Sequence, residues 1–263
     1  MKTNYHTHTY RCKHAMGNDE RIVLNAIKAD LDILGFSDHT PWPHFPADYD
    51  SHVRMEPQYL PEYCGSVNRL REKYKDQIEI HLGLEAEYFP HHMQELLDMK
   101  SEYGIEYLIY GAHYDELDAP VPERFYFGRD ILAPHDLERY EQNIIPGIES
   151  KFYTYVAHPD LFIRGYPYFD EHCVALSHRI FETFGTICCN HLPIDTHHFH
   201  MAKLQVRVTN QSQTSTMRIT QNPDSQRRFN KCIFLHTCAK VMPGNRHLIK
   251  NTLLKSIIID IKR

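Results

Sequence analysis

Histidine and carboxylate side chains recur at five places in the first 160 residues, each time at the end of a short apolar run. The chain contains 20 histidines in 263 residues, an excess that indicates a chemical role rather than packing. Imidazoles and carboxylates together bind zinc, manganese and iron, and a carboxylate such as that of Glu85 can bridge two ions. The residues concerned are His6, His8, Asp38, His39, Glu85, Glu87, His113 and His158. Their types and spacing predict a site for more than one divalent ion.

The pair His6 and His8 is the simplest part of this predicted site. Residues two apart on a strand point the same way, so both imidazoles could reach one ion. His14 follows six residues later, close enough for the loop to fold it back onto the same ions. A single histidine at a strand end is more often a hydrogen-bonded structural residue, but five such ends in succession favour a shared site. Asp38 and Asp160, each beside a presumed ligand, are expected to orient the imidazoles.

These polar residues need secondary structure that brings distant parts of the chain together. Apolar, β-rich runs predict strands at 2–8, 31–38, 78–86, 106–113, 153–158 and 185–190. Apolar residues at helical spacing predict helices at 19–29, 57–75, 92–103 and 135–148. Pro146 is expected to end the last of these helices early. The alternation predicts an α/β barrel with a parallel sheet, or alternatively an open doubly wound sheet. In a parallel barrel the carboxyl ends of the strands share one face, where the ligands would converge.

Charge is divided unevenly along the chain. Residues 1–197 contain 17 lysines and arginines against 32 aspartates and glutamates, whereas residues 198–263 contain 12 against 2. The acidic first part would repel a polyanion, so a nucleic-acid partner is not expected. We expect a barrel domain over residues 1–197 and a divergent basic tail, partly disordered, over residues 198–263. Such a tail could alternatively be a nucleic-acid arm.

Other classes of protein are disfavoured. Seven cysteines without a CxxC pair, in a chain of this length, argue against a disulfide framework and against a zinc knuckle. The sequence has no run of about 18 apolar residues and no signal-peptide pattern at its start, which favours a cytoplasmic protein without a membrane partner. The motifs GxGxxG, HExxH and GxSxG do not occur.

The strings YHTHT, CKHA, GFSDHTP, GLEAEY, GAHY and AHPD occur in this order and resemble the PHP (polymerase and histidinol phosphatase) family over about residues 1–190. The fuller strings HTHTYRCKHA, GFSDHTPW and GLEAEYFP most resemble its histidinol-phosphatase branch. The resemblance implies a distorted (β/α)7 TIM-like barrel, here incomplete or irregular at its C-terminus, with two or three divalent ions of zinc, manganese or iron. Carried over position by position, the ligands would be His6, His8, His14, His39, Glu85, His113 and His158, with Glu85 bridging.

The resemblance also implies a reaction. A histidinol-phosphatase removes phosphate from L-histidinol phosphate in histidine biosynthesis, by means of a metal-activated hydroxide. Glu85, His39 and His158 would carry the catalytic step. Arg164, or secondly Arg11, would hold the phosphate through paired hydrogen bonds.

The proline-rich segment 40–56 is expected to form a long loop over the barrel mouth. Its Trp42, His44 and Phe45 could surround an imidazole-bearing substrate. A loop of this kind would give the site its specificity.

The sequence departs from the family pattern near its end. The family closes with an Asp-x-His motif in a GxDAH setting, which this sequence lacks. Asp195-Thr196-His197 matches Asp-x-His, but Asp195 comes only 37 residues after His158. The last part of the barrel is therefore expected to be replaced or lost. Two alternatives stay open: a PHP phosphoesterase or exonuclease acting on another phosphoester, and a metal-binding homologue made inactive by loss of the last ligands.

Overall fold

The computed structural model describes residues 2–43, 53–116, 124–166, 168 and 170–191, and four two-residue strands farther along the chain. The chain divides into two compact units, residues 1–184 and 185–263. The first unit contains every residue expected to bind metal or phosphate, apart from the Asp195–His197 alternative. The position of the second unit therefore does not enter the geometry of these residues.

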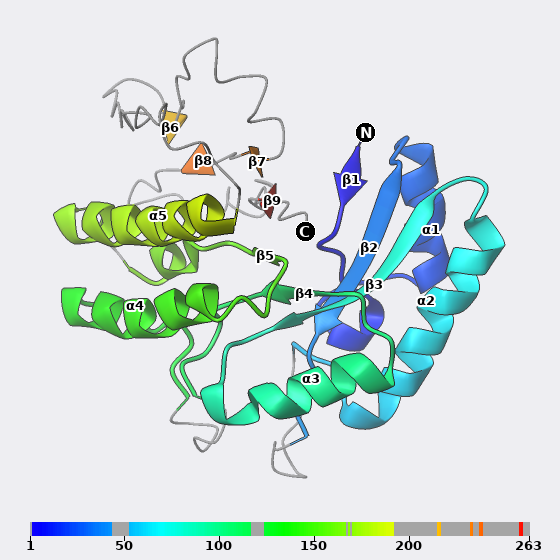
Figure 1. Cartoon of the computed structure of the whole chain (residues 1–263), viewed down its shortest axis with the longest axis horizontal. Coiled ribbons are helices and arrows are strands. Elements are labelled where there is room, and N and C mark those ends of the chain that lie inside the picture. Colours follow the sequence, from blue (N-terminus) through cyan, green and yellow to red (C-terminus); the bar gives the residue numbers. More distant parts are fainter. Residues whose placement is uncertain are drawn as a thin grey trace. The chain divides into compact units, whose positions relative to one another are not determined.

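Five parallel strands form the sheet of the first unit, in the order β1-β2-β3-β4-β5 (Figure 1). The strands are β1 (Thr3–Asn4), β2 (Ile33–His39), β3 (Glu79–Ala86), β4 (Tyr107–Tyr110) and β5 (Tyr155–Val156). Their spatial order follows the chain order, so among the described strands the order never reverses as it does in a doubly wound sheet. Among the described residues the sheet is a parallel half barrel, which confirms the predicted barrel class.

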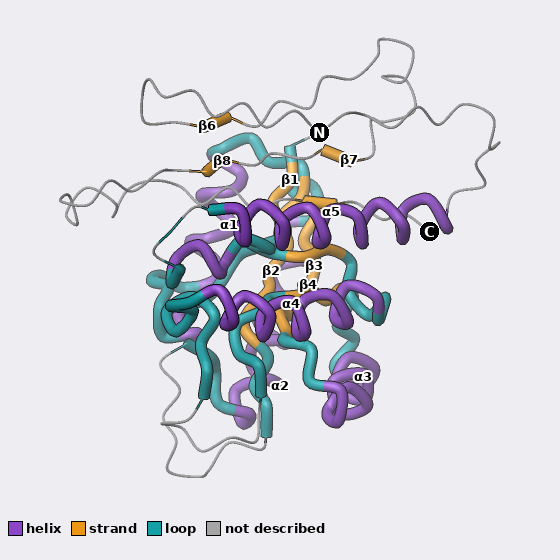
Figure 2. The backbone as a smooth tube through the Cα atoms, turned by 90° about the vertical axis from the view of Figure 1, so that its left-hand side faces the viewer, coloured by secondary structure: helices purple, strands orange, loops and turns teal. Residues whose placement is uncertain are grey.

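Helices follow the strands and cover the outside of the sheet (Figure 2). They are α1 (Asp19–Lys28), α2 (Leu60–Tyr74), α3 (Met93–Glu102), α4 (Pro134–Glu149) and α5 (Glu171–His191). Short 3-10 helices are η1 (Tyr10–Cys12), η2 (Pro57–Tyr59), η3 (Pro90–His92) and η5 (Leu161–Arg164). The four predicted helices are all present, and η2 forms the start of the segment predicted as helix over 57–75.

Strand β2 shows how the sequence builds both core and site. All seven of its residues are buried, as is usual for a strand of a parallel sheet covered by helices. Its first part, with Leu34 and Phe36, contributes apolar side chains to the core. Its last residues, Ser37, Asp38 and His39, are buried as well but polar. Polar groups buried at a strand end must find partners within the protein, and these residues find them in the site.

The strand predicted over 185–190 is wrong, because these residues belong to helix α5, which runs to His191. The segment GTICCN combines β-branched residues with a short apolar run, a window in which periodicity cannot separate strand from helix. A strand needs a neighbouring strand for its backbone hydrogen bonds, whereas a helix satisfies them within the segment. One glycine inside a helix costs only about 1 kcal/mol relative to alanine, too little to stop α5 at Gly185.

The expected early end of the fourth helix at Pro146 is also wrong, because α4 continues to Glu149. Proline removes one backbone N–H and its hydrogen bond from the helix. The last turn is held instead by packing against the sheet, where Ile144 and Ile148 are buried. Gly147 lies so close to Tyr110 that a Cβ atom there would be 2.3 Å from its ring. Tertiary packing thus outweighs the local cost of the proline.

The second unit contains two short antiparallel pairs. β6 (Ser215–Thr216) pairs with β8 (Thr237–Cys238), and β7 (Cys232–Ile233) pairs with β9 (Ile258–Ile259). Residues 192–200 lie outside the described residues, so the predicted boundary at residue 197 and the alternative ligands Asp195 and His197 stay predictions. His44 and Phe45 also lie outside the described residues. Among the helices described, none is both long and apolar enough to cross a membrane.

Candidate metal centre

The carboxyl ends of the strands bring the predicted ligands together. His39 is the last residue of β2, and it is the register partner of Glu85 on β3. The remaining strands deliver their histidines just beyond the last paired residue. His6 and His8 follow β1, His113 follows β4, and His158 follows β5. Each βα unit therefore contributes at the same edge of the half barrel, as the sequence predicted.

The carboxylate of Glu85 lies at the middle of this group. Its Oε2 atom is 2.9 Å from Nε2 of His6 and 3.1 Å from Nε2 of His8. The same oxygen is 3.4 Å from Nδ1 of His39. The side chain of Glu85 is 1% exposed, so these contacts are made without competition from bulk water.

The second oxygen of Glu85 faces the other two strand ends. Its Oε1 atom lies 3.0 Å from Nε2 of His158 and 3.3 Å from Nε2 of His113. The two oxygens thus face different sets of imidazoles. This is the arrangement that a carboxylate bridging two ions requires.

His14 reaches the group through the 3-10 helix η1 instead of a strand. Lys13, at the end of η1, has a left-handed φ of 59°, which turns the chain back toward the site. Nδ1 of His14 lies 2.7 Å from the carbonyl oxygen of Cys12, which fixes the orientation of the ring. The His14 ring centre is 5.0 Å from that of His8 and 5.3 Å from that of His39. The structure therefore brings all seven predicted ligands into one cluster.

Three ligand sets within the cluster have the composition and spacing of cation sites. In each set the ligand atoms lie within 4.8 Å of one another. The sets are His6, Glu85 and His158; His39, Glu85 and His113; and His8, His14 and His39. Glu85 belongs to two of them and His39 to two, as expected where neighbouring ions share ligands.

Two details of the cluster fit divalent ions better than a hydrogen-bond network. Nε2 of His6 lies 3.0 Å from Nε2 of His8, where only one of the two nitrogens can carry a hydrogen. Nδ1 of His39, which faces Oε2 of Glu85 at 3.4 Å, is buried without a hydrogen-bond partner among the described residues. Unprotonated nitrogens that converge on one another are stabilised when a cation lies between them. The residues present thus have the composition and spacing of a metal-binding cluster.

Burial and neighbouring charges together set the protonation of these side chains. Burial alone would lower the pKa of His113, but the carboxylates of Glu85 and Glu87 raise it to about 9, so a cation bound there would displace a proton. The effect of burial dominates at three other histidines. It lowers the pKa of His39 well below its usual value, and it lowers those of His14 and His158, so these rings are neutral near pH 7. Burial alone would raise the pKa of Glu85, but the surrounding imidazoles hold it well below its usual value. Neutral imidazole and ionised carboxylate are the forms that bind metal.

The backbone is adapted to the cluster at two points. His158 has a φ of 30°, a conformation that side chains other than glycine rarely adopt and that is often found at functional sites. Gly111 leaves room for the ligands, because a Cβ atom there would lie 2.3 Å from Cε1 of His113 and 2.5 Å from Oε1 of Glu85. A larger residue at position 111 would displace both side chains.

Asp38 supports the centre through Thr9. Its two oxygens accept hydrogen bonds from the backbone N–H and the hydroxyl of Thr9, each at 2.5 Å. The distance from Oδ1 of Asp38 to Nδ1 of His8 is 3.9 Å. Asp38 therefore fixes the chain directly after His8 and does not hydrogen-bond to the imidazole. Asp160 lies at the N-cap position of η5, close in sequence to His158.

The environment of Arg11 does not fit the phosphate-binding role expected from the sequence. Its side chain is 3% exposed, and its guanidinium pairs with Asp19 on α1 and Glu62 on α2. The contact with Asp19 is bidentate, with two N–O distances of 2.9 Å. The positive charge is therefore already neutralised by two carboxylates. Such a pairing could not be read from the sequence, because 51 positions separate Arg11 from Glu62.

Arg164 is the last residue of η5, and its side chain contacts Tyr126. Its Nη1 atom is 3.3 Å from the hydroxyl of Tyr126. The pKa of Tyr126 responds first to burial and then to the charges of Arg164 and Glu85. Burial raises the pKa of Tyr126, so its hydroxyl stays protonated. Tyr126 could not be predicted from the sequence, because a lone tyrosine matches no motif.

Glu87, Arg54 and Trp42 form a second group, whose mutual contacts the sequence did not predict. Glu87 is fully buried, and it contacts both Arg54 and Nδ1 of His113, the latter at 3.2 Å. Burial alone would raise its pKa, but Arg54 and His113 hold it well below its usual value. A sequence signal existed for Glu87, since residues two apart on a strand share a side and Glu85 was already a predicted ligand.

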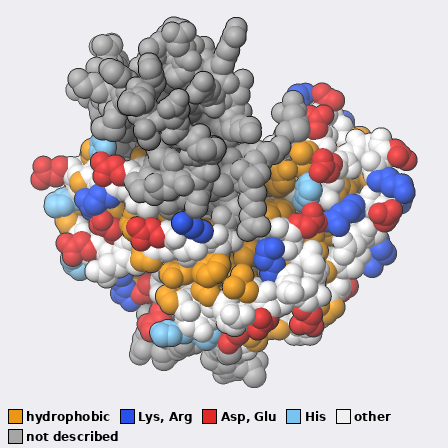
Figure 3. All heavy atoms as spheres, in the orientation of Figure 1, with side chains coloured by type: hydrophobic (Ala, Val, Ile, Leu, Met, Phe, Trp, Pro, Cys, Tyr) orange, Lys and Arg blue, Asp and Glu red, His pale blue; other side chains and the backbone are white. Residues whose placement is uncertain are grey.

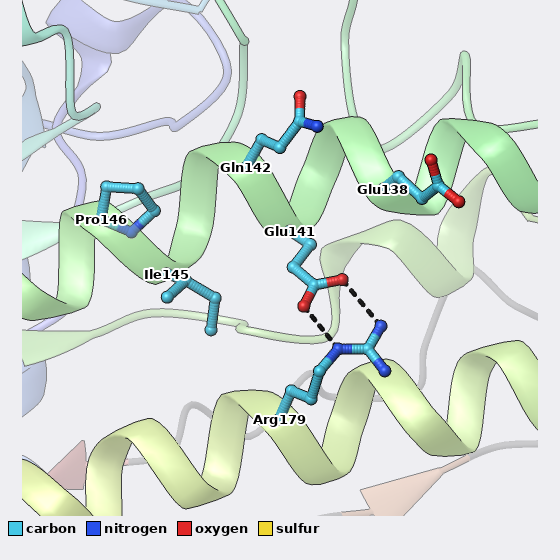
Figure 4. Close-up of a pocket in the computed structure, with 6 residues that line it drawn as sticks. All are labelled: Glu138, Glu141, Gln142, Ile145, Pro146 and Arg179. Carbon is cyan, nitrogen blue, oxygen red and sulfur yellow. Dashed lines mark hydrogen bonds and ion pairs between the residues drawn. The ribbon is translucent and has the colours of Figure 1, made fainter.

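A groove between α4 and α5 lies apart from these residues (Figure 4). Glu138, Glu141, Gln142, Ile145, Pro146 and Arg179 line it. The guanidinium of Arg179 spans the groove to pair with Glu141. None of the predicted ligands lines this groove, so it is not part of the centre.

The relatives of this chain among known proteins include two at modest identity. A Deinococcus radiodurans protein named "Probable histidinol-phosphatase" is 29% identical over 151 residues, which are 57% of this chain and 53% of the relative. A Schizosaccharomyces pombe protein of the same name is 27% identical over 195 residues, 70% of this chain and 60% of the relative. The chain thus matches little more than half the length of these relatives.

The same fold occurs in a solved structure. The crystal structure of histidinol phosphate phosphatase from Lactococcus lactis, complexed with zinc, L-histidinol and phosphate, superposes with a TM-score of 0.55 at 22% identity. The match covers 70% of each chain. A model of the PHP domain family matches residues 4–187, the span that contains the half barrel and all seven clustered side chains. The chain belongs to the PHP domain family.

Proposed function

We propose that the chain is a metal-dependent phosphomonoesterase that hydrolyses L-histidinol phosphate to L-histidinol and phosphate. The observation that carries this proposal is the contact of one buried carboxylate, Glu85, with five imidazoles. Two or three ions of zinc, manganese or iron fit the three overlapping ligand sets. When bound, such ions supply an activated water near neutral pH and offset the negative charge of a phosphate group.

The chain's own residues would hold and orient the reactants. Glu85, His39 and His158 would fix the ions at the place where the phosphorus atom is attacked. Arg164 would bind oxygens of the phosphate, since a guanidinium matches a phosphate in shape and charge. The hydroxyl of Tyr126, 3.3 Å from Arg164, would keep that guanidinium turned toward the centre.

The substrate is inferred from the relatives. Both carry a histidinol-phosphatase name, and the solved Lactococcus lactis protein contains L-histidinol and phosphate. A small phosphorylated substrate also suits the described surface: on the part of the face in Figure 3 that is not grey, basic side chains are interspersed with acidic ones. Histidine biosynthesis in the cytoplasm would be the setting of this reaction.

The test is phosphate release by the purified full chain loaded with manganese or zinc. Release from L-histidinol phosphate, and not from oligonucleotides, is the expected result. Release from oligonucleotides alone would favour a phosphoesterase or exonuclease of the same family. A protein that binds metal but releases phosphate from neither substrate would be a metal-binding homologue without activity.

A further inference from the structure

We propose that Glu87 is a positioning residue that links the metal ligand His113 to Trp42 and Arg54, so that the indole of Trp42 responds to metal binding. The inference rests on the metal centre of the proposed function and adds to it a residue that orients a ligand. Glu87 is fully buried; one of its carboxylate oxygens faces His113 and the other accepts a hydrogen bond from Trp42.

One oxygen of Glu87 faces the metal ligand. Its Oε1 atom is 3.2 Å from Nδ1 of His113 and accepts a hydrogen bond of 2.6 Å from Nη2 of Arg54. On the opposite side of the ring, Nε2 of His113 lies 3.3 Å from Glu85. A histidine that donates its Nδ1 hydrogen to a carboxylate presents the lone pair of Nε2 to the metal. Glu87 thereby selects the nitrogen of His113 that faces the centre.

The other oxygen of Glu87 faces the segment that follows β2. Its Oε2 atom accepts hydrogen bonds from Nε1 of Trp42 at 2.9 Å and from Nη1 of Arg54 at 3.2 Å. The Arg54 guanidinium also donates to the carbonyl of Thr40, at 3.0 Å. Trp42 and Arg54, which are 12 positions apart in the sequence, therefore both donate hydrogen bonds to the carboxylate of Glu87.

These contacts make a continuous path from the centre to an optical probe. Trp42 is the only tryptophan of the chain, and it is fully buried. A cation at Nε2 of His113 draws electron density from the ring and strengthens the Nδ1–H hydrogen bond to Glu87. Because Glu87 also accepts the indole N–H, the surroundings of Trp42 change when the ion binds.

The experiment is a titration of the metal-free full chain with zinc, followed by tryptophan emission and, separately, by a competing chromophoric chelator. Zinc has a closed d shell and no redox chemistry, so a change in emission reports a change in the protein. In the wild type, tryptophan emission should change with added zinc until it saturates. The midpoint of this change should coincide with the midpoint of zinc binding measured with the chelator. An emission that stays constant while zinc binds would overturn the inference and leave the proposed function standing.

The matched variants separate positioning from stability. Arg54→Met combined with Glu87→Met removes both charges and the acceptor for His113 without leaving an unpaired buried charge. We expect it to weaken zinc binding about 10–100-fold and to abolish the emission change. Arg71→Met with Glu106→Met makes the same substitutions in an ion pair remote from the centre, and both responses should stay as in the wild type. Wild-type zinc affinity in the first variant would refute the positioning role.

A measurement on the wild type tests the role of Glu87 even if the variant Arg54→Met with Glu87→Met does not fold. Long-range proton–nitrogen spectra of the zinc-loaded wild type should show the His113 hydrogen on Nδ1. A hydrogen on Nε2 would overturn the inference. Failure of the wild type to bind zinc at all would overturn the proposed function, and this inference with it.

Discussion

His39 and Glu85 stand opposite each other on neighbouring parallel strands, and Nδ1 of His39 lies 3.4 Å from Oε2 of Glu85. The pairing of β2 with β3 therefore places His39 beside the carboxylate of Glu85 without any contribution from a loop. The other imidazoles approach the same carboxylate from the neighbouring strand ends. The sheet itself sets the geometry of the centre.

Glu85→Gln should abolish turnover and reduce the number of bound ions. The substitution keeps the size of the side chain but removes the charge and one acceptor oxygen that faces the imidazoles. We expect a loss of activity of at least about 100-fold, since even residues that only support ligands cost 10–100-fold. Metal content by mass spectrometry of the purified protein checks the result. Glu79→Gln, on the exposed start of the same strand, should retain its metal. A normal metal content in Glu85→Gln would refute the bridging role.

Gly111→Ala should weaken metal binding with a change of only one methyl group. The new Cβ atom would lie 2.3 Å from the ring of His113 and 2.5 Å from Glu85, so both side chains must move. We expect metal affinity to fall about 10–100-fold, as for other disturbances of ligand orientation. Gly65→Ala in α2 is the control, because the atom nearest to its new Cβ would be at the end of the flexible Arg69 side chain, at 3.4 Å. That control should bind metal normally and gain about 0.5–1 kcal/mol of stability.

Arg164→Met should impair the reaction without removing the ions. The loss of charged hydrogen bonds to phosphate corresponds to about 1.5–3 kcal/mol, or roughly 10–100-fold in kcat/KM for L-histidinol phosphate. Steady-state kinetics and metal content together check this outcome. Arg179→Met, which breaks a surface ion pair with Glu141, should leave both unchanged. Unaltered kinetics in Arg164→Met would show that Arg164 does not bind the phosphate.

Arg11→Met should destabilise the fold, which distinguishes a structural role from phosphate binding. It leaves the buried carboxylate of Asp19 without its bidentate partner, a change that costs about 3–5 kcal/mol. Glu62 is half exposed, so Glu62→Gln should cost no more than about 1 kcal/mol. Urea unfolding of the two variants measures both values. A stable Arg11→Met protein with a raised KM would restore the phosphate-binding role.

His81 should make stability depend on pH. It lies between Glu106 and Glu79, and these carboxylates raise its pKa above 6.5 although burial opposes them. The folded state therefore holds the proton more tightly than the unfolded state, so the stabilisation is fully present below pH 6.5 and is lost as the pH rises through the folded pKa. In thermal unfolding, the difference between wild type and His81→Gln should shrink as the pH is raised from 6 to 9. A difference that is constant with pH would contradict this assignment.

Much of the site could be predicted because strand ends obey a simple rule. Carboxyl ends of parallel strands meet at one edge, so His6, His39, Glu85, His113 and His158 could be grouped from their order alone. The contacts of side chains across long separations could not be predicted in this way. Arg11 was expected to bind phosphate because it lies between two ligands in the sequence, whereas its partners come from the two helices packed behind it.

Secondary structure could be predicted where apolar residues recur at helical spacing over ten residues or more. It could not be predicted where a short apolar segment fits a strand and a helix equally well. The amphipathic segments became α1, α2, α3 and α4, but the six residues 185–190 carried too little periodicity to separate strand from helix. Pro146 shows the other limit. A local rule predicts that the helix stops, and contacts made by the following turn decide that it continues.

The register of β2 and β3 has a consequence for how this protein can vary. Side chains alternate along a strand, so inserting or deleting one residue within β2 would turn His39 away from Glu85 and bring Asp38 or Thr40 into its place. Loops between strands and helices can change length without this penalty. Natural variants with insertions and deletions should therefore carry them outside the two central strands, and a one-residue indel inside either strand should be found only in chains that have given up their metal.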